Sequence, residues 1–146
     1  MKKVLLASAL VVVLVSSVFA MSVGTVGTSV VAGFDLGSNL QAQVGGYFNN
    51  NSVGTEICAL GKIDYALMTK GALSAGVTGA FQMVTARVSG GSSSTGISGG
   101  LFLQADLTEK VSIQTTIPVI TITSVGGASA TTTSLEGGSL SVMYQM

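Results

Sequence analysis

The sequence contains no histidine and a single cysteine, Cys58. Histidine is the most common general base in enzymes and the most common metal ligand. Its absence excludes Ser-His-Asp and Cys-His catalytic arrangements. One cysteine alone excludes an internal disulfide and a cluster of thiolate ligands. We therefore expect a protein that is not an enzyme, with no catalytic residues, no metal site and no cofactor.

Charged residues are also scarce, at 8% of the chain against about 25% in ordinary soluble domains. The basic residues form no cluster, which excludes a nucleic-acid partner because phosphate binding depends on grouped Lys and Arg. The acidic residues lie in or beside turns and loops, where we expect them to line the rims of the fold rather than converge on one site. They are Asp35, Glu56, Asp64, Asp106, Glu109 and Glu136. A surface this poor in charge is better suited to lipid than to water.

The first twenty residues have the features of an export signal. Lys2 and Lys3 precede an apolar stretch that ends in Val-Phe-Ala at Ala20, with a small residue at the cut site. We expect cleavage there, so that 1–20 is a signal peptide and 21–146 is one domain. The alternative is an uncleaved anchor helix, because residues 4–23 are just long enough to span a bilayer.

The rest of the chain alternates apolar and polar residues with period two, as in strands with one apolar and one polar face. Leu40, Ala42 and Val44, for example, alternate with Gln41 and Gln43. The pattern predicts seven strands, at about residues 22–36, 40–49, 53–67, 72–88, 96–107, 111–124 and 134–146. The alternation changes phase after Met83, which predicts a β-bulge there. It changes again after Pro118, which predicts that the strand is either bulged or at an edge of the sheet, because proline cannot donate to the ladder.

The connections between these strands are alternately tight and loose. The tight connections are 37–39, 68–71 and 108–110, and the loose ones are 49–52, 89–95 and 125–133. Bacterial outer-membrane barrels have this asymmetry, with short periplasmic turns and longer outer loops.

A short repeat surrounds two of the tight turns. Residues 35–43 and 106–114 share the pattern Asp, Leu, three turn residues, apolar, polar, apolar, Gln, and Asp64-Tyr65 begins a third copy. An aspartate before each turn is expected to cap local backbone donors or to hold the hairpin in register.

With its leader, its strand spacing and a last strand carrying Leu140, Val142, Tyr144 and Met146, the chain resembles the small OmpA/OmpX-type outer-membrane barrels. The resemblance implies an all-β, closed antiparallel up-and-down β-barrel of about eight strands, located in the cell outer membrane. Such barrels have an even number of strands, so we expect a missed strand within residues 21–29 or 125–133. The alternative is a secreted, extracellular β-sandwich subunit of a surface filament or layer, which could accommodate an odd number.

In the barrel interpretation the main partner is the outer-membrane lipid bilayer. Phe34, Tyr65 and Tyr144 are expected to form part of an interfacial aromatic girdle. Loops 49–52, 89–95 and 125–133 are candidates for contact with a surface ligand. The residues expected to face lipid are Val26, Val30, Phe34, Leu40, Val44, Ile57, Ile63, Leu73, Val77, Leu101, Leu103, Ile113, Leu140 and Val142.

The polar faces of the strands would line the lumen, where we expect Glu56, Lys62, Asp64 and Gln104. Lys62 and Asp64 point the same way from one strand, and burying either charge unpaired would cost several kcal/mol. We therefore expect the two charges to pair with lumen neighbours such as Gln43 or Gln104. An eight-strand barrel is only just wide enough to be filled by side chains, so we expect at most minor pore activity. The sequence assigns no oligomeric state.

Overall fold

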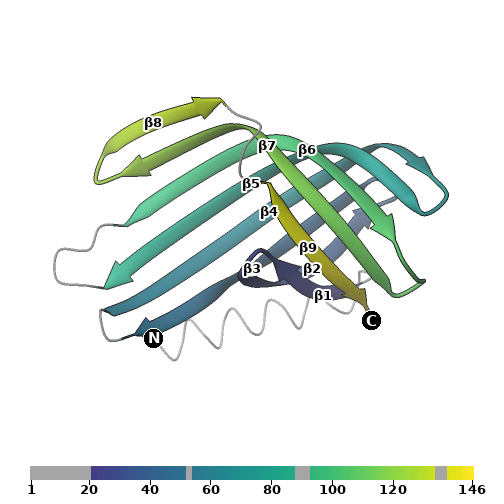
Figure 1. The fold of residues 1–146 in the computed structure, drawn as a ribbon, viewed down its shortest axis with the longest axis horizontal. Helices are drawn as coiled ribbons and strands as arrows, with labels where there is room; N and C mark the ends of the chain where they lie inside the picture. The colour runs from purple at the N-terminus through teal and green to yellow at the C-terminus, as the bar shows by residue number, and fades with distance from the viewer. Residues whose placement is uncertain (1–20, 52–53, 88–92, 134–137) are drawn as a thin grey trace.

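The computed structural model describes residues 21–51, 54–87, 93–133 and 138–146, and all the regular structure within them is β (Figure 1). No helix within these ranges is long and apolar enough to cross a membrane. The expected signal peptide, residues 1–20, lies outside the described residues. The strands are β1 Met21–Val26, β2 Ser29–Gly37, β3 Leu40–Asn51, β4 Gly54–Lys70, β5 Leu73–Arg87, β6 Ser94–Asp106, β7 Val111–Val125, β8 Ala128–Thr133 and β9 Ser139–Gln145.

Eight of these strands form a closed antiparallel ring. Each of β1 to β6 pairs with the strand that follows it, β7 pairs with β9, and β9 pairs with β1. The ninth strand, β8, lies outside the ring and pairs with β7. The predicted all-β, eight-stranded closed barrel is therefore confirmed. The alternative of a two-sheet sandwich is wrong, because one continuous ladder runs around the whole molecule.

Both places suspected of hiding a strand contain one. The predicted strand 22–36 is in fact the hairpin of β1 and β2, joined by a two-residue turn at Gly27-Thr28, where Gly27 has φ +57°. The predicted loop 125–133 is a hairpin in which β8 pairs with the end of β7. Its turn residues Gly126 and Gly127 have φ +57° and +89°, as the tight hairpin turns of type I′ require. Residues 125–133 are thus not a loose loop.

The two ends of the barrel differ. The turn end carries the short connections 38–39, 71–72 and 107–110 together with both ends of the ring, where the Met146 amide donates to the Met21 carbonyl at 3.0 Å. The opposite, loop end carries the connections after β1, β3, β5 and β7. The expected contrast between tight and loose connections is wrong at most of the loop end. Connections 27–28, 52–53 and 126–127 contain two residues each, as short as 38–39 and 71–72 at the turn end, and 88–93 is the one longer connection between paired neighbours at the loop end.

The barrel wall is complete only toward the turn end. β1 and β2 stop short, so residues 47–51 of β3 pair with β4 alone, and β8 pairs with β7 alone, among the described residues. Toward the loop end the wall is thus an open trough of β3, β4, β5, β6, β7 and β8. In Figure 1 β3 and β8 border its open side, with β4, β5 and β6 between them.

The two faces of the wall carry opposite chemistry. Most of the buried side chains are polar, whereas large apolar side chains are exposed around the outside, including Ile63 at 55% and Leu101 at 52%. Of the residues expected to face lipid, one faces the lumen and one is buried on the outer side. Val26 lies opposite the buried Ser29 and Ser141 and therefore faces inward, because the Gly27-Thr28 turn reverses the alternation. Phe34 is on the outer side by register, opposite Ala42, but only 6% of it is exposed.

Of the two expected bulges, the one at Pro118 is confirmed. Gly99 and Gly100 are opposite Ile120 and Pro118, which leaves Val119 as the extra residue. The prediction of a bulge after Met83 is wrong. The pairing of β5 with β4 continues there without a shift, and Val84 lies opposite the buried Cys58. The apolar Val84 thus belongs to the inner face, which the alternation rule alone assigns to polar residues.

Candidate functional site

A cluster of polar side chains fills the middle of the barrel. Lys62 and Asp64 project inward from β4, Gln43 from the neighbouring β3, and Gln114 from β7 across the lumen. The alternation of each strand places them there, because residues two apart share a face. All four side chains are fully or almost fully buried, with 0–3% of each exposed.

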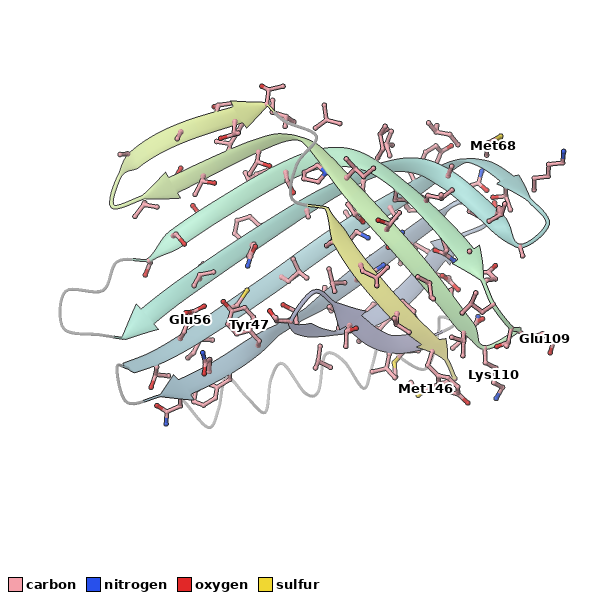
Figure 2. All side chains as sticks on the ribbon, viewed as in Figure 1. Tyr47, Glu56, Met68, Glu109, Lys110 and Met146 are labelled. Atoms are coloured by element: carbon pink, nitrogen blue, oxygen red, sulfur yellow. The ribbon has the colours of Figure 1, made fainter. Side chains whose placement is uncertain are left out.

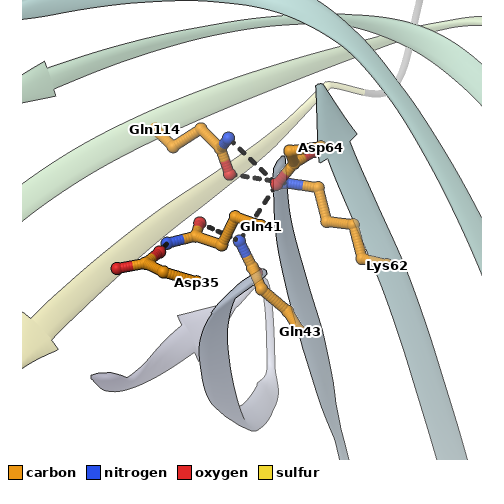
Figure 3. Close-up of polar contacts among 6 residues, drawn as sticks. All are labelled: Asp35, Gln41, Gln43, Lys62, Asp64 and Gln114. Carbon is orange, nitrogen blue, oxygen red and sulfur yellow. Dashed lines mark hydrogen bonds and ion pairs between the residues drawn. The ribbon is translucent and has the colours of Figure 1, made fainter. Parts of the chain in front are cut away.

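Asp64 is the centre of this cluster (Figure 3). Its Oδ2 is 3.0 Å from Lys62 Nζ and accepts hydrogen bonds from Gln43 Nε2 at 3.1 Å and Gln114 Nε2 at 3.2 Å. Lys62 also donates to Gln114 Oε1, so a chain of contacts crosses from β4 to β7. We call these four residues the central plug.

The plug continues toward the turn end. Gln43 donates to Gln41 Oε1 at 3.2 Å, and Gln41 donates to Asp35 Oδ1 at 3.1 Å (Figure 3). This series of hydrogen bonds extends the polar contacts from the centre of the barrel to the rim.

The four residues proposed from the sequence for the lumen do not form one site. Lys62 and Asp64 lie together in the plug. Glu56 lies near the loop end, where the Tyr47 hydroxyl donates to it (Figure 2). Gln104 donates to Asp106 Oδ1 at 3.0 Å near the turn end and has no contact with Asp64 among those the structure describes.

Gln114 is the plug residue that the sequence reasoning missed. The sequence repeat could have indicated Gln114 as a partner of Asp64, because Gln43 and Gln114 occupy the last position of its two copies. In the barrel these two equivalent glutamines donate to the same oxygen, Asp64 Oδ2. The expectation that the acidic residues only line the rims therefore fails at Asp64.

The plug separates two cavities. On the loop-end side Lys62 lines a cavity of about 360 Å³ together with Tyr47 and Pro118. On the turn-end side Asp64 lines a cavity of about 330 Å³ with Asp35 and Gln104. The ion pair is thus oriented along the barrel, with its cation toward one opening and its anion toward the other.

Five buried side-chain oxygens have no hydrogen-bond partner among the described residues. They are Gln43 Oε1, Asp64 Oδ1, Thr78 Oγ1, Thr116 Oγ1 and Ser141 Oγ. A buried polar atom without a hydrogen bond costs about 1–3 kcal/mol. Of these residues, Asp64 lines the turn-end cavity and Thr116 lines the loop-end cavity, where a further hydrogen-bonding group can reach them.

The thiol of Cys58 and the carboxylate of Asp64 are both engaged by neighbouring side chains. Cys58 is buried, and its sulfur accepts a hydrogen bond from Gln82 Nε2 at 3.2 Å. Within the described ranges no three His, Cys, Asp or Glu side chains are grouped closely enough to hold a metal ion. Asp64 is already occupied by a lysine and two amides, which leaves one of its oxygens for a further contact.

No protein-family model matches the chain, and no curated protein matches it.

Proposed function

We propose that the chain is an exported outer-membrane β-barrel that is closed to ions and serves a structural or surface-interaction role. The observation that carries this proposal is its inverted polarity. A water-soluble fold buries apolar side chains, whereas this barrel buries a lysine, an aspartate and two glutamines and exposes leucine, isoleucine and valine. A lipid surround makes that exposure favourable.

The height of the apolar band supports the same proposal. The outer residues of β4 from Ile57 to Leu67 are apolar or aromatic, apart from Gly61. Ten residues of strand span about 33 Å, which becomes about 25 Å along the membrane normal at the usual strand tilt of about 40°. This height matches the apolar band of bacterial barrels, about 25 Å.

We place the turn end toward the periplasm and the loop end outward, because the longest connection, 88–93, and the strands that extend beyond the closed ring lie at the loop end, and the outer side of such barrels carries the longer segments. The trough of β3 to β8 is then the outward surface. The exposed β8, Ala-Ser-Ala-Thr-Thr-Thr, contributes only small uncharged side chains to it. We propose this trough, in place of the three expected loops, as the surface available to a partner.

Membrane fractionation of the exported protein tests the proposal, with gel mobility compared before and after boiling. Recovery in the outer membrane with a boiling-dependent shift is the expected result, because a closed barrel resists detergent until it is heated. Recovery in the medium without detergent would overturn the membrane assignment.

A further inference from the structure

Three aspartates from separate strands line one region at the turn end of the barrel. Asp35 of β2 and Asp106 line a cavity of about 460 Å³, and Asp35 and Asp64 line the adjoining cavity of about 330 Å³. The two cavities share Asp35, Gln41 and Gln104, and we call them together the turn-end vestibule. The acidic residues expected to stay apart on the rims thus partly converge.

These are the three aspartates of the sequence repeat. Asp35 and Asp106 begin the two complete copies, and Asp64 begins the partial third copy. The copies end at Gln43 and Gln114, which both hold Asp64 from opposite sides of the lumen. The repeat therefore places two carboxylates at the mouth of the vestibule and a third at its floor.

The carboxylates are only partly satisfied by the protein. Asp64 is 2% exposed, and its Oδ1 has no partner among the described residues. Asp35 and Asp106 each accept one glutamine amide, from Gln41 and Gln104, at Oδ1. An ionised carboxylate has about four acceptor sites, so these groups can take further donors from a ligand.

Positive charge in the vestibule is insufficient to balance the acids. Glu109 adds a fourth acidic residue, and the one basic residue among the described lining is Lys110. Its Nζ lies over the Tyr144 ring, 5.8 Å from the centroid. Lys62 compensates the charge of Asp64 at 3.0 Å, which leaves Asp35, Asp106 and Glu109 against Lys110. The vestibule is therefore a net acidic recess with low-dielectric walls, an arrangement that concentrates cations.

The spacing of the acids selects the kind of cation. The described carboxylates are not grouped closely enough to surround a single metal ion. Ammonium groups spaced along a flexible aliphatic chain can each reach a separate carboxylate, with charge-assisted hydrogen bonds at each. We propose that the turn-end vestibule binds a small aliphatic polyamine.

Calorimetric titration of the purified, folded chain with spermidine tests this site. Uncharged maltoside micelles are the medium, because the site requires the closed barrel and not the bilayer. Absence of spermidine binding would therefore leave the membrane assignment intact, and failure of the membrane assignment would leave spermidine binding intact. We expect saturable binding at about 0.15 M ionic strength, weakened about tenfold or more by Asp35→Asn with Asp106→Asn.

Two further variants make the result specific. Glu56→Gln removes one acidic charge at the opposite end of the lumen and should leave the affinity unchanged. Lys110→Ala removes the basic residue from the vestibule and should tighten binding, which provides a test even if the double aspartate variant does not fold. Folding of each variant is checked by the boiling-dependent gel shift.

Three outcomes would overturn the proposal. They are absence of saturable binding, equal affinity in the folded double aspartate variant, and equal weakening by Glu56→Gln. Displacement of spermidine by an equal concentration of Mg²⁺ would also overturn it, because it would identify a site for inorganic cations.

Discussion

Asp64 is the residue on which the interior of the barrel depends. It compensates the charge of Lys62 and accepts hydrogen bonds from two glutamines that are themselves buried. Removing one member of a buried ion pair leaves the other uncompensated, at a cost of about 3–5 kcal/mol. We expect Asp64→Ala to lower the free energy of unfolding by that amount, as measured by urea titration in lipid vesicles.

The control is the double variant Lys62→Met with Asp64→Leu, which removes both charges and keeps most of the volume. Replacing a buried ion pair by apolar side chains is often neutral or stabilising, so the double variant should recover most of the loss. A double variant as unstable as Asp64→Ala alone would show that packing, rather than uncompensated charge, is responsible.

The sequence predicts where the plug residues point but not which of them meet. Alternation along β4 is enough to place Lys62 and Asp64 on the polar face. Gln114 is 50 residues from Asp64 in the chain, and its approach is set by how the strands are staggered around the closed ring. Local alternation carries no information on that stagger, so the sequence predicts Gln104 as a partner of the ion pair and does not predict Gln114.

At the scale of the elements, β3 to β7 follow the predicted segments closely, whereas the two ends of the chain do not. The pattern predicts one strand across the β1–β2 hairpin, because a two-residue turn barely interrupts the alternation. The pattern predicts a loop in place of β8, because Ala-Ser-Ala-Thr-Thr-Thr has no contrast between apolar and polar residues. Alternation detects strands only where the two faces meet different environments, and every residue of β8 is exposed.

The pairing of β1 with β9 closes the ring, and it is shorter than the pairing of β3 with β4. Gly24 lies in this short seam, where a Cβ atom would collide with the Val142 backbone oxygen. Gly24→Ala must therefore shift the backbone of β9, and overpacking of this kind costs about 1–3 kcal/mol.

Gly79→Ala is the matched control for Gly24→Ala, because a Cβ atom at Gly79 meets nothing within 4 Å. We expect it to change the stability by less than about 0.5 kcal/mol. Urea unfolding and the boiling-dependent gel shift measure both variants. Equal effects of the two substitutions would contradict the assignment of Gly24 to a tight closing seam.

At the scale of the whole molecule, the apolar band should determine how the barrel sits in a bilayer. Val77 lies on the outer face, 42% exposed and opposite Tyr65 and Leu101. Arginine at the bilayer midplane costs an outer-membrane barrel about 2–4 kcal/mol, and we expect Val77→Arg to lose that much stability in vesicles. Thr133→Arg, on the exposed β8, should lose almost none, and a similar loss at both positions would argue against the proposed band.

Whether the barrel conducts depends on the volume of the plug as well as its charge. Cavities of about 360 and 330 Å³ already lie on its two sides, so shortening Lys62 and Asp64 joins spaces that exist. In planar bilayers we expect the wild-type chain to give no sustained current and Lys62→Ala with Asp64→Ala to give steady current steps. The Met and Leu double variant removes the same charges but should stay closed, because apolar side chains still fill the gap. Current through both double variants would mean that charge alone blocks the lumen, and sustained current through the wild-type chain would contradict the closed barrel.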